Sequence, residues 1–259
     1  MEVKRIIEFG VPIPEEARAY NDDCLVVSEF FFDTIQGEGQ CLGTPAAFLR
    51  LSGCPLGCKF CDTTEVWKKA NKVKIPWLLN QILTTGLLKK LILGQHLVIT
   101  GGSPLMQQDH LADFIKGLDR MVPEGIEKVF IEVENECSIV PNDFLLRRVN
   151  MWNNSPKLKN SQVDYIKRYK PEAMKKLKEA YGEVYYKFVV KGQEDWEEIL
   201  TEYIYPGYVQ PSDIFLMPMG ADFKEYSENR EKVIELAVEY GVNYSPREHI
   251  AIWDKKTGI

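Results

Sequence analysis

The chain has 259 residues, 45% of them hydrophobic, which is enough for one large domain with a sizeable core. Its formal net charge of −6 excludes the broad cationic surface that binding to nucleic acid requires. No apolar run approaches the roughly 18 residues of a membrane span, and the charged, proline-containing start is unlike a signal peptide. We therefore expect a soluble cytoplasmic protein with neither nucleic acid nor membrane as a partner.

Short apolar runs alternate along the chain with amphipathic segments. The apolar runs predict buried strands at residues 25–32, 46–51, 97–100, 129–133, 186–190 and 214–217. The amphipathic segments predict helices at residues 76–83, 107–118, 171–181, 194–202 and 223–240. This alternation predicts a parallel sheet with helical crossovers. About six βα units are too few for a closed eightfold barrel, so we expect an α/β fold of the open, partial TIM-like barrel type.

Three of the six cysteines, Cys54, Cys58 and Cys61, lie within eight residues. In a long intracellular chain such clustering indicates a metal site rather than disulfides. Spacings of three and two residues, with glycines in the turn, let one loop direct three thiolates at one centre. Three ligands leave one iron of a [4Fe–4S] cluster open, whereas a structural zinc site is closed by four. Zinc completed by a distant residue is the alternative. The remaining cysteines are expected to be lone thiols: Cys24, Cys41 and Cys137.

The segment Cys54-Pro-Leu-Gly-Cys58-Lys-Phe-Cys61 resembles the signature of the radical S-adenosylmethionine superfamily, including the aromatic residue before the last cysteine. This resemblance implies that the open iron chelates the amino and carboxylate groups of the cofactor. It also implies that one electron from the reduced cluster breaks the S–C5′ bond, and that the resulting 5′-deoxyadenosyl radical takes a hydrogen from the substrate.

Longer matches point to one family within the superfamily, the 7-carboxy-7-deazaguanine synthases. They are Phe32-Asp-Thr-Ile-Gln-Gly-Glu-Gly39, Gly43-Thr-Pro-Ala-Ala-Phe-Leu-Arg50, Cys61-Asp-Thr63, Thr100-Gly-Gly102, Ser155-Pro-Lys157 and Ser245-Pro-Arg247. The resemblance covers residues 28–259 as a single radical S-adenosylmethionine domain, after an N-terminal extension at residues 1–27. It implies ring contraction of 6-carboxy-5,6,7,8-tetrahydropterin to 7-carboxy-7-deazaguanine, with release of ammonia, in queuosine-type 7-deazapurine biosynthesis. It further implies Mg2+, a homodimer and a flavodoxin- or ferredoxin-type reductant.

The resemblance assigns substrate contacts to the glycine-rich segment, two strand ends and the chain end: Ile35, Gln36, Gly37, Glu38, Arg50, Thr100 and Ile259. Backbone groups and one carboxylate can read the donors and acceptors of a pterin edge, and glycine permits their close approach. A guanidinium grips a carboxylate bidentately, so Arg50 is the expected clamp. Thr63 is the expected Mg2+ ligand, because Mg2+ prefers oxygen ligands and keeps several waters.

The resemblance assigns contacts with S-adenosylmethionine to a further set: Phe60, Cys61, Asp62, Gly102, Ser155, Pro156, Lys157 and Met217. Lys157 is expected to pair with the cofactor carboxylate or to bond its ribose. Asp62 has an alternative role as a helix cap. The sequence departs from the family pattern at one position, because Gly-Gly is followed by Ser103 where the family has glutamate. A carboxylate is therefore missing there.

Two other functions fit the cysteines alone. A different radical S-adenosylmethionine enzyme, such as a glycyl-radical activase, would leave the matches at residues 36–39 and 155–157 unexplained. A non-catalytic zinc- or cluster-binding interaction protein on the same scaffold is favoured slightly by Ser103. Iron content separates the last from both enzymes, because an iron–sulfur protein is brown and a zinc protein is colourless.

Overall fold

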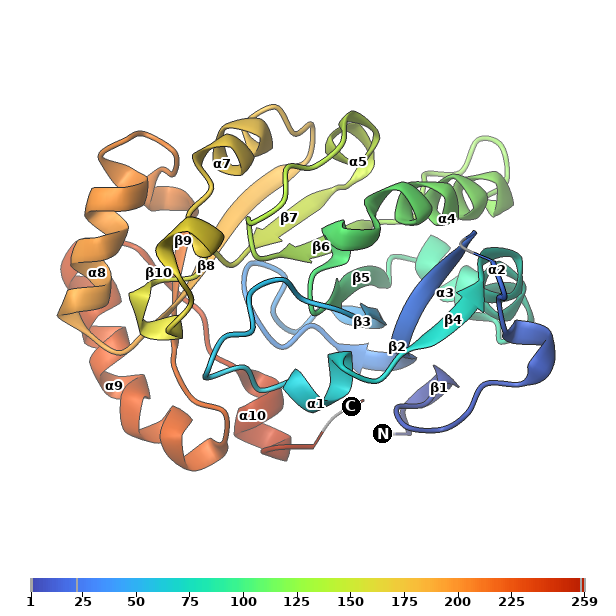
Figure 1. Cartoon of the computed structure of the whole chain (residues 1–259), viewed down its shortest axis with the longest axis horizontal. Coiled ribbons are helices and arrows are strands. Elements are labelled where there is room, and N and C mark those ends of the chain that lie inside the picture. The colour runs from blue at the N-terminus through green and yellow to red at the C-terminus, as the bar shows by residue number, and fades with distance from the viewer. Residues whose placement is uncertain (1, 22, 257, 259) are drawn as a thin grey trace.

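The computed structural model describes residues 2–21, 23–256 and 258 (Figure 1). In this part of the chain ten strands form one sheet, in the order β1-β2-β3-β5-β6-β7-β8-β9-β10, with β4 paired to β2. The strands are β1 Lys4–Ile7, β2 Cys24–Ile35, β3 Pro45–Leu51, β4 Asn71–Lys74, β5 His96–Gly101, β6 Ile131–Asn135, β7 Met151–Asn154, β8 Glu183–Val190, β9 Ile214–Pro218 and β10 Asn243–Tyr244.

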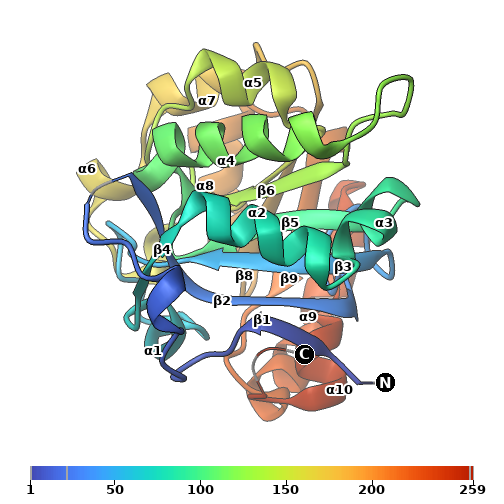
Figure 2. The ribbon, with the colours of Figure 1, turned by 90° about the vertical axis from the view of Figure 1, so that its right-hand side faces the viewer.

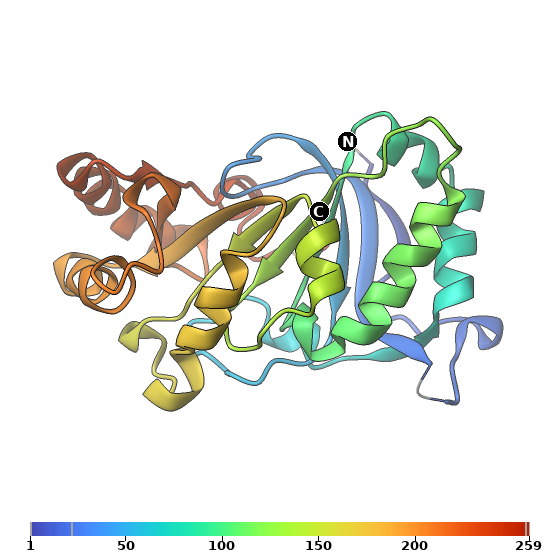
Figure 3. The same ribbon diagram turned by 90° about the horizontal axis from the view of Figure 1, so that it is seen from above.

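The centre of the sheet is parallel. Strands β3, β5, β6, β7, β8 and β9 pair in that order, all parallel, and helices lie in the connections between them. Antiparallel β1, β2 and β4 continue the sheet on one side and the short β10 ends it on the other, so within the described chain the barrel stays open. Figure 3 shows the sheet between the green helices and the orange and red ones. The predicted partial barrel of about six βα units is confirmed.

Helices cover the outer face of the sheet, and Figure 2 shows α2, α4 and α5 layered there. The helices are α1 Thr64–Trp67, α2 Ile75–Thr84, α3 Leu87–Ile92, α4 Gln108–Met121, α5 Asp143–Arg148, α6 Tyr165–Arg168, α7 Pro171–Leu177, α8 Gln193–Ile199, α9 Phe223–Tyr240 and α10 Glu248–Trp253. In α4, Leu111, Phe114, Ile115 and Leu118 recur at helical spacing and are fully buried. The core therefore lies between the helices and the sheet. Among the described residues, no helix combines the length and apolar content that a membrane crossing needs.

The residues before the predicted boundary at residue 27 are built into the same sheet. β1 pairs antiparallel with residues 30–32 of β2, and Ile7, Ile13 and Ala17 are buried in the main core. β2 itself begins at Cys24, so the boundary falls inside a strand. The segment is thus packed against the domain that follows it.

Two glycines at the end of β5 allow the site to be assembled. A Cβ on Gly101 would lie 2.0 Å from the Leu51 carbonyl oxygen, and one on Gly102 would lie 2.0 Å from that of Gly53. The Ser103 amide donates to the Gly53 carbonyl at 2.7 Å. Close backbone approach therefore requires glycine here, and it joins β5 to the loop that carries the cysteines.

Candidate functional site

A cavity of about 270 Å³ lies at the carboxyl ends of the parallel strands. The cysteine loop, the end of β2 and α10 complete its wall. The structure brings together all the predicted site residues except two, because Pro156 is buried without lining the cavity and Ile259 lies outside the described residues. The site is thus where parallel α/β sheets place their ligands.

Cys54, Cys58 and Cys61 line one end of this cavity, and none of the three forms a disulfide. Within the described residues, the single group of three Cys, His, Asp or Glu side chains with donor atoms within 4.8 Å of one another lies elsewhere. The three thiols are therefore spread more widely than the ligands of one ion. That spread fits a multi-iron cluster better than mononuclear zinc, for which a fourth ligand would also be needed.

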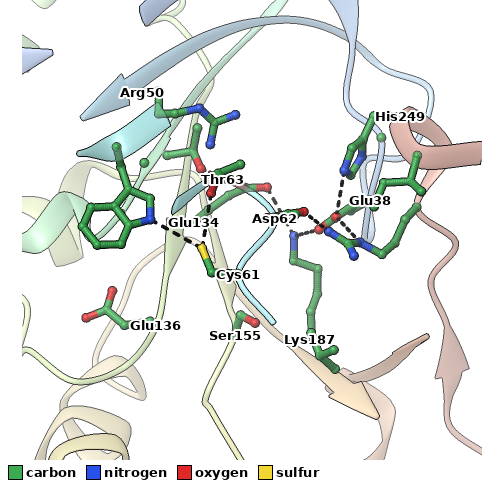
Figure 4. A pocket seen from close by; sticks show the side chains of 18 of the residues that line it. Glu38, Arg50, Cys61, Asp62, Thr63, Glu134, Glu136, Ser155, Lys187 and His249 are labelled. Carbon is green, nitrogen blue, oxygen red and sulfur yellow. Dashed lines mark hydrogen bonds and ion pairs between the residues drawn. The ribbon is translucent and has the colours of Figure 1, made fainter. Parts of the chain in front are cut away.

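The surroundings of the three cysteines affect the pKa of two thiols and provide hydrogen bonds to the third. Burial raises the pKa of Cys54 and Cys58, whereas backbone hydrogen bonds from Leu56 and Gly57 act against it at Cys54 and the Lys157 ammonium acts against it at both thiols. The Trp67 indole donates a hydrogen bond to Cys61 Sγ at 3.4 Å, and Thr63 Oγ1 lies 3.7 Å from the same sulfur (Figure 4). Hydrogen bonds to ligand sulfurs are one means of setting a cluster's reduction potential.

Buried ion pairs form the other end of the cavity. Glu38 pairs with Lys187 at 2.9 Å and with Arg247 at 3.2 Å, and Lys187 also reaches Glu134 at 3.2 Å (Figure 4). Burial alone would raise the pKa of Glu38, but the charges of Lys187 and Arg247 outweigh it and hold that pKa well below its usual range. Arg247 also pairs with Asp62. The network ties the glycine-rich segment to the cysteine loop and to the C-terminal region.

Neither Asp62 nor Thr63 caps helix α1 with its side chain. Thr63 occupies the N-cap position of α1 but caps no backbone amide with its side chain, and the Asp62 carboxylate is engaged by Arg247. The alternative of Asp62 as a helix cap is therefore wrong. Thr63 lines the cavity, and its hydroxyl contacts Cys61 Sγ at 3.7 Å.

Arg50 is oriented by a neighbouring carboxylate. Its Nε donates to Glu29 Oε1 at 2.7 Å, and the two side chains are 16% and 3% exposed. Its two terminal nitrogens have no partner in the described part of the chain. Figure 4 shows the guanidinium near Thr63. The free face of the guanidinium can thus accept a carboxylate in the bidentate manner.

Polar groups from β5, β6, β7 and the residue after β2 meet between these two ends. Thr100 donates to Glu134 at 2.6 Å, and the Gln36 amide donates to Glu132 at 3.2 Å and to Glu134 at 3.5 Å. Asn153 lines the cavity, and its Oδ1 is buried without a hydrogen-bond partner among the described residues. A buried acceptor of this kind calls for a ligand donor.

Sequence reasoning gave no role to several of these residues: Glu134, Glu136, Asn153, Lys187, Arg247 and His249. Lys187 offered a signal, since it interrupts the apolar run at residues 186–190 and yet its side chain is only 3% exposed. A lysine at an inward strand position needs buried partners, and here it has two.

An open parallel barrel with three unpaired thiols in one loop facing its cavity defines an iron–sulfur protein of the radical S-adenosylmethionine class. The family model described as a 4Fe-4S single cluster domain matches residues 35–131. The crystal structure of QueE from Escherichia coli is similar over 89% of this chain and 100% of that one, with a TM-score of 0.60 at 24% identity. This structural likeness shows a shared fold.

Two relatives narrow the class further. The 7-carboxy-7-deazaguanine synthase of Pyrobaculum aerophilum is 31% identical over 88% of this chain and 94% of its own length. That of Hyperthermus butylicus is 30% identical over 85% and 90%. The chain belongs to the 7-carboxy-7-deazaguanine synthase family, and its cofactors are a [4Fe–4S] cluster and S-adenosylmethionine. The family predicted from the sequence is confirmed, against both the glycyl-radical activase and the non-catalytic alternative.

Proposed function

We propose that the protein converts 6-carboxy-5,6,7,8-tetrahydropterin to 7-carboxy-7-deazaguanine with release of ammonia, in queuosine-type 7-deazapurine biosynthesis. The name shared by the relatives supports this reaction. The observation that carries it is a single cavity, with Cys54, Cys58 and Cys61 at one end and the free guanidinium face of Arg50 within reach of the same space. A carboxylated substrate can thus be held beside the cofactor.

When bound, the cluster supplies the electron for cleavage of the S–C5′ bond of S-adenosylmethionine, which starts the radical chemistry. The three thiolates would hold the cluster and leave one iron free for the cofactor. Phe60, Val189 and Met217 pack together on the cavity wall and suit the adenine. Lys157, held by Ser155 at 2.7 and 2.8 Å, presents a cation for the cofactor carboxylate. Together these residues orient the cofactor and keep water away from it.

At the substrate, Arg50 would take the carboxylate with its two terminal nitrogens, because Glu29 already occupies Nε. Thr63, whose hydroxyl caps no helix, would give Mg2+ one oxygen ligand, and the substrate carboxylate and waters would complete the shell. Glu134 provides an acceptor for the pterin N–H groups. Ile35, Gln36, Gly37, Glu38 and Thr100 would form the remaining substrate wall.

The terminal carboxylate of Ile259 is proposed to meet substrate amines. The residue lies outside those described, but two observations favour the idea. Gly258 lines the cavity, and its carbonyl oxygen accepts a hydrogen bond from Arg5 at 3.0 Å. Gly258, the last described residue, thus lies beside the proposed substrate region.

The proposal extends to partners and compartment. By resemblance to the family, the protein would act as a cytoplasmic homodimer and would receive electrons from a flavodoxin- or ferredoxin-type protein. Sedimentation equilibrium of the anaerobic holoenzyme tests the dimer, since a mass equal to one chain at micromolar concentration would reject it.

Paired substrates test the function. Anaerobic holoenzyme is incubated with dithionite, S-adenosylmethionine and Mg2+, either with the carboxylated tetrahydropterin or with the same pterin lacking the carboxylate. We expect the deazapurine from the first substrate alone. Thr63→Ala should lose the Mg2+ dependence, whereas Thr64→Ala, whose hydroxyl bonds the Cys61 carbonyl at 3.4 Å, should keep it. Equal cofactor cleavage with both pterins and no deazapurine would reject the proposal.

A further inference from the structure

A carboxylate from the residue after the neighbouring strand β6 lies beside position 103, where the family has glutamate. Ser103 is fully buried, and its hydroxyl donates to Glu136 Oε1 at 2.9 Å. Glu136 directly follows β6, and Ser138 donates to the same oxygen. The residue that replaces the family's glutamate is therefore in contact with another glutamate.

Glu136 is buried without a counter-charge. It is 5% exposed, and in the described part of the chain no Lys, Arg or His nitrogen lies within the 4.0 Å of an ion pair. Its second oxygen, Oε2, is buried and has no hydrogen-bond partner among those residues. A buried carboxylate in this state is costly unless a ligand pairs with it. Because Glu136 lines the cavity, a cationic ligand group can reach it (Figure 4).

The position of Glu136 indicates which cation this is. Ser103, which holds Glu136, also donates its amide to Gly53, the residue before Cys54. Lys157 lines the same cavity and brings the opposite charge. We propose that Glu136 binds the α-ammonium group of S-adenosylmethionine, with Ser103 fixing the carboxylate in place. The inference rests on the proposed function only in the identity of the cofactor, and the pterin has no part in it.

Cofactor binding without turnover tests this role. Reconstituted holoenzyme is titrated with S-adenosylmethionine in the absence of reductant and pterin. Hydrogen bonds to charged groups contribute about 1.5–3 kcal/mol, so Glu136→Gln should weaken binding about 10- to 100-fold. Exposed Glu127→Gln should bind as the wild type does. Moving the carboxylate back, with Ser103→Glu and Glu136→Ser together, should restore most of the affinity.

A cofactor analogue with hydrogen in place of the amino group completes a thermodynamic cycle. The wild type should lose affinity for this analogue, and Glu136→Gln should lose little more, because the contact is already gone. The proposal would be overturned if the variant and the analogue reduced affinity additively. It would also be overturned if Glu136→Gln bound S-adenosylmethionine as tightly as the wild type does. If the losses of affinity are non-additive but no deazapurine forms from the pterin, the role of Glu136 is supported and the proposed substrate is rejected.

A second, separate group of donors lies at the amino-terminal end of the parallel strands. Donor atoms of Cys41, His96 and Glu132 lie within 4.8 Å of one another. His96 Nδ1 is 2.5 Å from Glu132 Oε1, and Cys41 Sγ is 3.5 Å from Met151 Sδ. Cys41 lies in the loop before β3, His96 is the first residue of β5, and Glu132 is in β6. The fold thus brings together three residues that are far apart in the sequence.

A thiol, an imidazole and a carboxylate are ligands that Zn2+ binds. Glu132 is fully buried, and its other oxygen accepts from Gln36 at 3.2 Å and Asn153 at 2.7 Å. Cys41 and His96 are only half-buried, which leaves an ion a path from solvent. We infer that these three side chains bind a zinc-type divalent cation. Since Gln36 and Asn153 also line the cavity, the ion would stiffen the floor of the site.

Zinc K-edge X-ray absorption of the holoenzyme, loaded with one equivalent of Zn2+ and then desalted, tests this site. We expect one sulfur at about 2.3 Å and nitrogen or oxygen ligands at about 2.0–2.2 Å. His96→Gln should lose the zinc, and His110→Gln should keep it. Loss of zinc from the wild type on desalting, or a shell of three sulfurs that survives His96→Gln, would overturn the proposal.

Discussion

Replacing Lys187 with methionine tests whether buried ion pairs hold the substrate end of the site together. The side chain is 3% exposed and pairs with Glu38 at 2.9 Å and Glu134 at 3.2 Å. Methionine is similarly long but uncharged, so both carboxylates lose a cation, although Glu38 keeps Arg247. Removing one partner of a buried pair costs about 3–5 kcal/mol. In a chain of this size each kcal/mol lowers Tm by about 2–4 °C, which gives a fall of about 6–20 °C.

The assay is thermal unfolding of the anaerobic protein, followed by far-ultraviolet circular dichroism at fixed pH. Lys224→Met is the matched control, because Lys224 and Glu228 are 87% and 65% exposed and 4.0 Å apart. An exposed pair contributes about 0–1 kcal/mol, so this control should lower Tm by no more than about 4 °C. If Lys187→Met lowers Tm no more than the control does, the reasoning about the network is refuted.

Three further predictions concern pH, the cluster and the substrate. The low pKa of Glu38 means that its stabilising effect over Glu38→Gln is fully present above pH 4.5 and is lost progressively below it, which Tm against pH measures. A difference that already disappears between about pH 5 and 7 would contradict this assignment. Trp67→Phe removes the hydrogen bond to Cys61 and should lower the reduction potential of the cluster in a redox titration; an unchanged potential would be the contrary result. Arg50→Lys should raise the substrate KM about 10- to 100-fold, with the S-adenosylmethionine affinity unchanged.

The fold was predictable where hydrophobic pattern alone decides the structure. Helix α9 follows the prediction at both ends, because Asp222 caps its first turn and Gly241 ends it with φ of 64°. Strands β1 and β4, with sequences KRII and NKVK, were not predicted, since they are four residues long, add to an edge of the sheet and carry exposed charged residues. The helix expected at 194–202 gives way to a π-helical turn from Leu200, which the residue pattern does not signal.

The site was predictable where its residues are close in the sequence. The cysteines share one loop, and the glycine pair reveals the close backbone contact that the loop needs. The ion-pair network could not be predicted from the sequence, because Lys187 and Glu38 are 149 positions apart and no local pattern links them. Ser103 seemed to remove a carboxylate from the site, but Glu136 follows the adjacent strand and its carboxylate accepts a hydrogen bond from Ser103. The proximity of Ser103 and Glu136 depends on the pairing of β5 with β6, which the sequence does not reveal.

Mass spectrometry of the products of a single anaerobic incubation tests the proposed ring contraction most directly. Holoenzyme is mixed with dithionite, S-adenosylmethionine, Mg2+ and 6-carboxy-5,6,7,8-tetrahydropterin, and Cys58→Ala serves as the control that lacks a cluster ligand. We expect 7-carboxy-7-deazaguanine and ammonia in equal amounts from the wild type and neither from the variant. Formation of 5′-deoxyadenosine by the wild type with the pterin recovered unchanged would contradict it.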